Sequence, residues 1–353
     1  MKLYFRRTSL PLTHPFTIAT GTTTEVHTVL IAIEHDGVVG LGEAAPIRAY
    51  GQDGDSVVAS LPIAAAALAL GNDPADFEAN ADALIAALPA QLATVAAVDA
   101  ALHDLAAKRL GLPTWRRLGV RPADMPVTTF TIGIDSIERI ERKVAEAAGW
   151  PFLKIKLGCD RDEQIVRAVR KCTDVPVRVD ANQGWDLARA KRMCRWLAEF
   201  NVELIEQPLP RGREDQLAEL KADSPLPIYV DESCHTGADV VRLAGCVDGV
   251  NLKLSKAGGI TAALRFIHAA RAAGLGVMIG CMVQSSVGIS AGAQLAPLCD
   301  QVDLDGHLLL ARDTASGLDR RDGRLVLGDA PGQGVTLLPE YADLSSWTPV
   351  AAR

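Results

Sequence analysis

Lysine and acidic residues follow short apolar segments at nearly constant intervals in the second half of the chain. Lys156, Asp180, Glu206, Asp231 and Lys253 are separated by 24, 26, 25 and 22 residues. Each interval is close to the length of one strand–helix unit, so we expect these residues to lie at similar heights on successive strands. In a barrel of such units, the carboxyl ends of the strands form the active site.

Three of these residues, Asp180, Glu206 and Asp231, predict a metal site. Carboxylates on three adjacent strands would converge on one point, and that concentration of negative charge is costly without a cation. Oxygen ligands with no nearby histidine favour Mg²⁺, or Mn²⁺, over zinc. The alternative is that each acid only caps the helix after its strand, which explains one acid better than three at matched spacing.

The flanking lysines predict acid–base chemistry. Lys156 and Lys253 lie on opposite sides of the expected ring, so a substrate held by the metal presents one face to each. A lysine acts as a base only when its pKa is lowered, and burial, the metal and the nearby ammonium group of Lys154 all lower it. Lys256 competes with Lys253, but strand alternation places it on the other face, so we assign the role to Lys253. The alternative for Lys154 and Lys156 is a solvated surface pair, which their apolar neighbours disfavour.

Strands and then helices are expected in the first 125 residues. Val26–His35 is rich in β-branched residues, and the turn Asp36-Gly37 joins it to a second strand, VVGLGEA, in a hairpin. Ser56–Leu110 has the spacing of three helices. Gly40–Ala45 matches the GxGxxA pattern of dinucleotide sites. We reject that reading because a proline and a loop follow where the site needs a helix.

After about residue 125, short apolar strands alternate with amphipathic helices. The strand candidates are VTTFTIG, FLKIKLG, VPVRVDA, VELIEQP, LPIYVDES, GVNLKLS, LGVMIGCM and VDLDG. Eight such units predict an α/β fold with a closed parallel barrel. We expect an α+β domain over residues 1–125, the barrel over 126–322, and a C-terminal segment, 323–353, that returns to the first domain.

Composition excludes several classes of protein. The 353 residues carry a formal net charge of −7, which argues against a nucleic-acid partner. The longest apolar stretch begins at Leu61, is about ten residues long and contains Pro62, so no membrane span is expected. The first residues lack the apolar core of a secretory signal. Seven cysteines without a CxxC pair fit reduced thiols in the cytoplasm.

The motifs LKIKLG, DANQGW, IEQP, VDES and NLKLSKAGG together resemble the enolase superfamily, in its muconate-lactonizing subgroup. The resemblance covers nearly the full chain. It implies a (β/α)7β modified TIM barrel with an N-terminal α+β capping domain. It also implies that Asp180, Glu206 and Asp231 bind the metal and that Lys156 and Lys253 are the acid/base pair. Further implied roles are tuning of Lys156 by Lys154 and support near the metal by Asn182.

Asp303 and Asp305 narrow the class of substrate that the site is expected to bind. Alternation directs both carboxylates to one side of the last strand, where they could hold an ammonium group. Dipeptide epimerases of the superfamily carry a DxD motif there, which binds the α-amino group of the substrate. The alternative is a turn with Gly306 in the left-handed conformation.

The expected pocket departs from its relatives at two positions. Family members that act on Ala-Glu have an arginine in the loop after the first strand, whereas this chain has Thr20. We therefore expect an apolar or cationic side chain, and not glutamate, in the second residue of the substrate. Gln284 stands where relatives often have a glutamate, and Thr131 is a further candidate for the pocket. Asp53 and Asp55 either attract a cation or are solvated turn residues.

We therefore expect a cytoplasmic, Mg²⁺-dependent dipeptide epimerase that inverts the α-carbon next to the terminal carboxylate. The two lysines would transfer the proton through an enediolate. Its expected partner is a dipeptide, with assembly into a homo-oligomer left open. Alternatives on the same scaffold are an o-succinylbenzoate synthase-like lyase and an N-acylamino-acid racemase. A barrel without catalytic activity that serves as a binding protein is the alternative of a different class.

Overall fold

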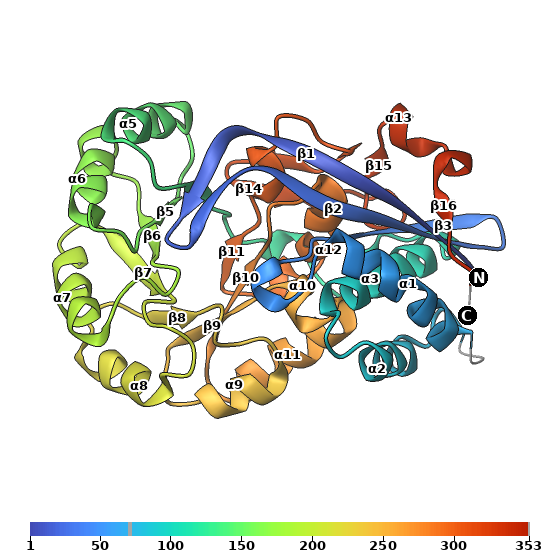
Figure 1. Ribbon diagram of the computed structural model, residues 1–353, viewed down its shortest axis with the longest axis horizontal. Coiled ribbons are helices and arrows are strands. Elements are labelled where there is room, and N and C mark those ends of the chain that lie inside the picture. The colour runs from blue at the N-terminus through green and yellow to red at the C-terminus, as the bar shows by residue number, and fades with distance from the viewer. Residues whose placement is uncertain (70–72, 352–353) are drawn as a thin grey trace.

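The computed structural model describes residues 1–69 and 73–351. Its N-terminal part is an antiparallel sheet in the order β16-β1-β2-β3, covered by three helices (Figure 1). The strands are β1 (Lys2–Ile18), β2 (Gly21–His35), β3 (Val38–Ala44) and β16 (Thr348–Pro349), and the helices are α1 (Gly54–Leu68), α2 (Phe77–Ala87) and α3 (Leu92–Arg109). The C-terminal segment thus supplies an edge strand to the N-terminal sheet. The domain boundaries at residues 125 and 322 stay predictions.

The predicted hairpin joins β2 to β3. Asp36 and Gly37 both have positive φ, 51° and 76°, as a type I′ turn requires, and His35 pairs with Val38. The glycines of the rejected dinucleotide pattern lie within β3, where they allow close packing against α3. A Cβ atom on Gly40 would lie 2.1 Å from the carbonyl oxygen of Ala101. The pattern therefore serves packing between sheet and helix.

We expect Gly40→Ala to destabilise the protein, because an added methyl group has no space between β3 and α3. Overpacking of this kind costs about 1–3 kcal/mol. The thermal unfolding midpoint, followed by circular dichroism, should fall for this variant. Gly54→Ala is the matched control, since a Cβ there would meet only Arg7, at 3.6 Å. Equal midpoints for the two variants would contradict the close packing.

The eight strand candidates form one parallel sheet in the order β11-β10-β9-β8-β7-β6-β5-β4. They are β4 (Phe130–Ile132), β5 (Leu153–Lys156), β6 (Val177–Asp180), β7 (Val202–Glu206), β8 (Ile228–Val230), β9 (Gly249–Leu252), β10 (Gly276–Gly280) and β11 (Gln301–Asp303). A parallel bridge between Thr128, just before β4, and Val302 in β11 closes the ring. This confirms the predicted barrel.

Helices surround the barrel because their apolar faces pack on the outer side of the strands. They are α5 (Ile137–Glu146), α6 (Asp162–Cys172), α7 (Leu187–Leu197), α8 (Glu214–Asp223), α9 (Gly237–Leu243), α10 (Leu254–Ala257), α11 (Ile260–Ala272) and α12 (Ser286–Ala293). Short helices α4 (Thr114–Arg117) and α13 (Pro339–Ala342) lie outside this ring order. Both α10 and α11 follow β9, and after β11 comes a 3₁₀ turn, Gly306–Leu309, in place of a helix, so helices follow seven of the eight strands. The architecture is therefore (β/α)7β, as the resemblance implied.

The hairpin of β1 and β2 reaches from the N-terminal sheet to the open end of the barrel (Figure 1). Its tip contacts the loops that follow β4 and β5: Ile134 N donates to Thr17 O at 2.9 Å, and a Cβ on Gly158 would lie 2.9 Å from Ala19 Cβ. The N-terminal domain therefore covers the carboxyl ends of the strands. Among the described helices, none is both long and apolar enough to cross a membrane.

Candidate active site

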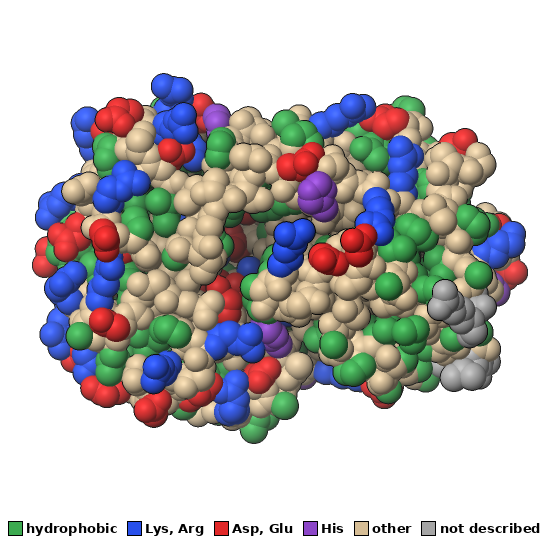
Figure 2. Space-filling model, in the orientation of Figure 1, with side chains coloured by type: hydrophobic (Ala, Val, Ile, Leu, Met, Phe, Trp, Pro, Cys, Tyr) green, Lys and Arg blue, Asp and Glu red, His purple; other side chains and the backbone are tan. Residues whose placement is uncertain are grey.

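The predicted site residues lie where the barrel strands end. Lys156, Asp180 and Glu206 are neighbours in register on β5, β6 and β7. Glu206 pairs with Tyr229 on β8, so Asp231 lies two residues further along, just beyond the end of that strand. The expected equal height therefore holds for the first three residues only. Figure 2 shows a hollow in this face of the molecule, with acidic and basic side chains at its bottom.

Asp180 and Glu206 are fully buried beside two lysines. Asp180 Oδ2 lies 2.6 Å from Lys156 Nζ and 3.4 Å from Lys154 Nζ, and Glu206 Oε2 lies 2.6 Å from Lys154 Nζ. Burial opposes ionisation of Asp180, but the two ammonium groups offset it and lower the pKa of this acid. Burial, and then the charge of Asp180, raise the pKa of Glu206. The two acids and two lysines thus form one buried charge cluster.

On the other side of the site, Asp231 contacts Lys253 and Lys256, the two lysines that compete for the second acid/base role. Its Oδ2 lies 2.9 Å from Lys253 Nζ, and its Oδ1 accepts from Lys256 Nζ. Lys256 Nζ also donates to the carbonyl oxygens of Asp231, Cys234 and Asn251, at 2.6, 3.0 and 3.2 Å. Lys256 is therefore held by four oxygen atoms, which favours Lys253 as the lysine available to a substrate.

The expectation that strand alternation places Lys256 on the other face from Lys253 is wrong. Strand β9 ends at Leu252, Lys253 is the N-cap of α10, and Lys256 lies within that helix. Strand alternation therefore does not separate the two lysines. The two lysines differ instead in their contacts, because the ammonium group of Lys256 is already bound by oxygen atoms.

Within this charge cluster, the pKa values of Lys253 and Lys154 are raised. Burial alone would lower the pKa of Lys253, but the charge of Asp231 raises it overall. Lys154 behaves in the same way, because Asp303, Glu206 and Asp180 outweigh its burial. A base of this kind therefore needs a cation that competes for the carboxylates.

The carboxylates of Asp180, Glu206 and Asp231 do not by themselves form a complete metal-binding site. Among residues 1–69 and 73–351, no group of three His, Cys, Asp or Glu side chains has an arrangement that could hold a metal ion. Each of these carboxylates instead forms an ion pair with the ammonium group of a lysine. The donor chemistry nevertheless fits a divalent cation. Within the same ranges, Asn182 Oδ1 and Glu232 Oε2 are buried and form no hydrogen bond, whereas Glu206 Oε2 contacts the Lys154 ammonium group. Such hard oxygen atoms are ligands that Mg²⁺ prefers.

Asn182 lies next to this cluster, as the resemblance implied. Its backbone N–H donates to Asp180 Oδ1 at 2.9 Å, and its side chain donates to Glu232 Oε1 at 3.3 Å. Asn182 has a φ of 42°, a conformation that non-glycine residues adopt rarely and that clusters at functional sites. This turn holds the Asp180 carboxylate in place.

Asp303 and Asp305 are both buried at the end of β11. Lys154 Nζ and Thr129 Oγ1 donate to Asp303, each at 2.6 Å, and the backbone N–H of Thr131 donates to Asp305 Oδ2 at 2.6 Å. β11 ends at Asp303, so alternation does not extend to Asp305, whose φ and ψ are −105° and 1°. The charge of Asp303 still acts on Asp305: burial, and then this charge, raise the pKa of Asp305 to about 7.

The alternative turn is not formed, because Gly306 is absent from the residues with positive φ in the described ranges. A Cβ on Gly306 would lie 2.4 Å from Met282 O, so the glycine permits close packing with the loop after β10.

The remaining predicted pocket residues lie on different elements. Thr20 is exposed at the tip of the β1–β2 hairpin. Gln284 is buried before α12, where a Cβ on Gly288 would contact both its Nε2 and Glu43 Oε2. The pocket roles of Thr20, Thr131 and Gln284 stay predictions. Asp53 caps α1, and Asp55 pairs with Arg7 at 2.6 Å, as solvated residues of a turn would.

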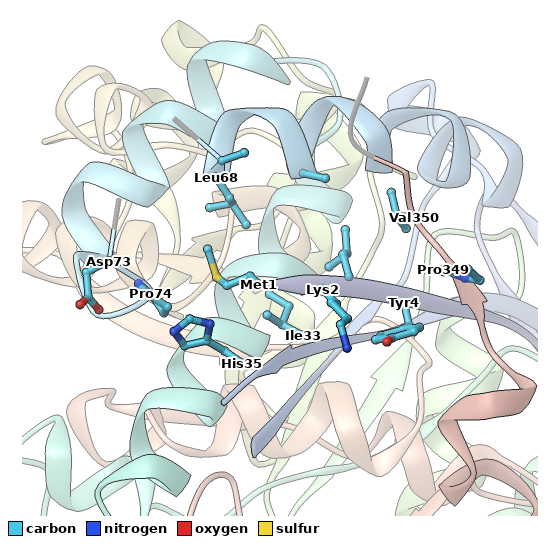
Figure 3. A pocket seen from close by; sticks show the side chains of 13 residues that line it. Met1, Lys2, Tyr4, Ile33, His35, Leu68, Asp73, Pro74, Pro349 and Val350 are labelled. Carbon is cyan, nitrogen blue, oxygen red and sulfur yellow. The ribbon is translucent and has the colours of Figure 1, made fainter. Parts of the chain in front are cut away.

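A pocket of about 660 Å³ lies elsewhere, between β1, β2, α1 and the C-terminal segment (Figure 3). Met1, Ile33, Leu68 and Val350 are among its lining residues. It contains no residue of the predicted site, so the chemistry does not lie there.

Comparison with known families agrees with this arrangement. The model described as Mandelate racemase / muconate lactonizing enzyme, N-terminal domain, matches residues 2–119, and the model described as Enolase C-terminal domain-like matches residues 137–341. The chain belongs to this enolase-superfamily group. An L-Ala-D/L-Glu epimerase of Bacteroides thetaiotaomicron is 40% identical to it over 337 residues, which are 95% of this chain and 88% of the relative.

Two further relatives of this enolase-superfamily chain are dipeptide epimerases. A hydrophobic dipeptide epimerase of Roseobacter litoralis is 40% identical over 96% of this chain and 99% of the relative. The crystal structure of a dipeptide epimerase from Cytophaga hutchinsonii, complexed with Mg and the dipeptide D-Ala-L-Val, has a TM-score of 0.92 at 28% identity. It covers 99% of this chain and 98% of that one.

Two residues of this enolase-superfamily site, Asn251 and Thr129, were not assigned a role from the sequence. Asn251 Nδ2 donates to Glu206 Oε1 at 2.6 Å, and Thr129 Oγ1 donates to Asp303 Oδ1. Asn251 stands two residues before Lys253, and that spacing along a strand was a signal that could have found it.

Proposed function

We propose that this enolase-superfamily protein is a Mg²⁺-dependent dipeptide epimerase. The observation that carries the proposal is the placement of Lys156 and Lys253 on either side of three buried acids, with Asp303 and Asp305 at the end of a further strand. Two amines that approach one carbon from opposite faces suit inversion. The thiols of all seven cysteines are free, which supports the cytoplasmic location that we propose with it.

Asp180, Glu206 and Asp231 would hold the Mg²⁺. When bound, the ion supplies positive charge that stabilises the enediolate formed from the substrate carboxylate. Lys156 would remove or return the α-proton on one face and Lys253 on the other. Lys154 contacts Glu206 and Asp303 at 2.6 Å, so it would position both the metal side and the ammonium side of the site.

Overall similarity to known relatives does not separate the possible dipeptide substrates. The side chains that the enzyme prefers are therefore inferred from the residues of the pocket. Relatives that are equally similar to this chain, at 40% identity, are described as acting on Ala-Glu and on hydrophobic dipeptides. The hairpin tip over the barrel carries Ala19 and Thr20 and no cation to pair with a glutamate side chain. We therefore propose a second residue that is apolar or cationic.

The two acids at the end of β11, Asp303 and Asp305, separate this function from the alternatives. The substrates of an o-succinylbenzoate synthase or an N-acylamino-acid racemase have no ammonium group, so Asp303 and Asp305 would have no charge to bind. The test is to incubate a library of L,L-dipeptides with the enzyme and Mg²⁺ in deuterium oxide. Mass spectrometry should detect α-deuterium and chiral chromatography the L,D product. Absence of exchange in every dipeptide would refute the proposal.

Asp305→Asn should weaken dipeptide binding. A hydrogen bond to a charged group contributes about 1.5–3 kcal/mol, so we expect KM to rise about 10- to 100-fold. Asp305 has a pKa of about 7 and is neutral below it, so kcat/KM of the wild type should fall as the pH drops through that value. The acidic limb of the profile should be absent from the variant.

The surroundings of Asp305 make this pH profile interpretable. Asp303 and Lys154 stay charged because their pairing lowers the pKa of the acid and raises that of the amine. Burial raises the pKa of Cys281, which therefore stays neutral. An N-acetylated dipeptide is the matched control, since it lacks the ammonium group and should bind the wild type and the variant equally. A retained acidic limb in Asp305→Asn would contradict the assignment.

A further inference from the structure

The two candidate bases are held in different ways. Lys156 is part of β5 and pairs in register with Asp180 on β6, so the sheet itself fixes its backbone. Lys253 lies just beyond β9 and caps α10, a helix of only four residues. A single helical turn has little stability of its own, so its position depends on what it packs against.

The far end of α10 is pressed against α3 of the capping domain. Gly258 and Gly259 follow the helix with φ values of 97° and 108°. A Cβ on Gly259 would lie 2.4 Å from Asp99 Oδ2, and a Cβ on Gly258 would contact Leu92 and Val95 at 3.6 Å. The backbone between α10 and α11 therefore approaches α3 as closely as glycine allows.

Asp99 holds the segment at this contact. The side chain is fully buried, and it accepts hydrogen bonds from Thr261 N at 3.1 Å and from Thr261 Oγ1 at 2.7 Å. A residue of the capping domain thus caps the start of α11, whose own N-cap, Gly259, has no side chain to do so. Burial raises the pKa of Asp99 to about 6, so the carboxylate is ionised at neutral pH.

A chain of donors supports this carboxylate. Because Thr261 Oγ1 donates to Asp99, it accepts from His103 Nε2, 2.9 Å away, and His103 Nδ1 accepts from Arg117. Burial lowers the pKa of His103, which agrees with a neutral ring that donates from one nitrogen and accepts at the other. Phe77 stacks on His103 with ring centroids 4.2 Å apart and lies 4.0 Å from the Arg117 guanidinium carbon. The donors of this network are thus ordered from Arg117 through His103 and Thr261 to Asp99.

We propose that Asp99 is a positioning residue that sets the placement of Lys253 but not of Lys156. The inference rests on the proposed epimerase function. It makes the capping domain a determinant of one of the two proton transfers, in addition to covering the site.

The test uses the two stereoisomers of one dipeptide substrate, each incubated separately in deuterium oxide. The isomer that no longer exchanges in Lys253→Ala is the one whose α-hydrogen faces Lys253. In Asp99→Asn, exchange of that isomer should fall about 10- to 100-fold, since a misplacement near 1 Å can cost 10²-fold. Exchange of the other isomer should stay near the wild-type rate. A general loss of fold would slow both isomers alike.

Two further variants sharpen the test. Thr261→Val removes one donor to Asp99 without changing the side-chain shape, and it should give the same asymmetry with a smaller effect. Asp104→Asn is the matched control: Asp104 is also buried on α3, but it accepts from Leu41 and Gln333, away from α10. Equal slowing of both isomers in Asp99→Asn, or no slowing, would overturn the proposal. Absence of exchange in the wild type would instead refute the epimerase function.

Discussion

Lys253→Ala should abolish epimerisation while leaving hydrogen exchange from one stereoisomer. Inversion needs one group to remove the α-proton and a second to deliver a proton to the opposite face. Loss of one such group costs about 10²- to 10⁴-fold. Lys156 can still remove the proton on its own side, exchange it with solvent and return it to the same side. One isomer should therefore acquire deuterium without changing configuration.

Lys156→Ala should give the mirror-image result, with exchange only from the isomer that faces Lys253. Proton NMR follows loss of the α-hydrogen signal, and chiral chromatography measures inversion. Lys143→Ala is a suitable control, because Lys143 is also a largely buried lysine in an ion pair, 3.0 Å from Asp135, but it lies on α5 outside the barrel. Inversion at the wild-type rate in either active-site variant would refute the two-base mechanism.

Removal of divalent metal should have an effect of similar size. The negative charge that develops on the substrate carboxylate needs a cation, which contributes several kcal/mol to transition-state stabilisation. We expect chelation with EDTA to eliminate both exchange and inversion, and added Mg²⁺ or Mn²⁺ to restore them. Metal binding should also raise the thermal midpoint of the wild type, since a ligand of the folded state stabilises it.

Glu206→Gln should prevent this recovery. The amide keeps the shape of the fully buried side chain but removes the charge that a divalent ion requires. The variant should therefore remain inactive after Mg²⁺ is added, and its thermal midpoint should not respond to the ion. Glu203→Gln is the matched control on the same strand, where Glu203 pairs with Arg178 at 2.7 Å near the opposite end of the barrel. Activity of chelated wild type, or full Mg²⁺ recovery of Glu206→Gln, would contradict the proposed metal site.

Sequence patterns located most of the fold because the relevant forces act over short distances along the chain. The strands β4 to β11 are apolar segments that alternate with helical ones, and burial of both faces of such strands requires a parallel sheet. The turn Asp36-Gly37 marked a hairpin because those residue types adopt positive φ readily. The proline and loop after Gly40–Ala45 argued against a dinucleotide site, and the structure has a strand at Gly40.

The contacts within the charge cluster were harder to predict from the sequence. The tuning of Lys156 by Lys154 stays a prediction, and the sequence did not indicate that the Lys154 ammonium group contacts Glu206 and Asp303. Lys253 was expected on a strand but caps a short helix. The error for Lys253 arises because alternation describes a strand only up to its last residue, and the predicted site residues stand at or beyond that point.

The sequence alone was sufficient to order the predicted acids and lysines around the ring, because in a barrel the interval along the chain sets the strand with which a residue is associated. Only the tertiary structure decided which oxygen atom each ammonium group contacts, and it alone brought Asp99 of the capping domain against the helix that follows Lys253. These contacts join segments more than 150 residues apart. They depend on how two separately patterned domains pack, and no local pattern carries that information.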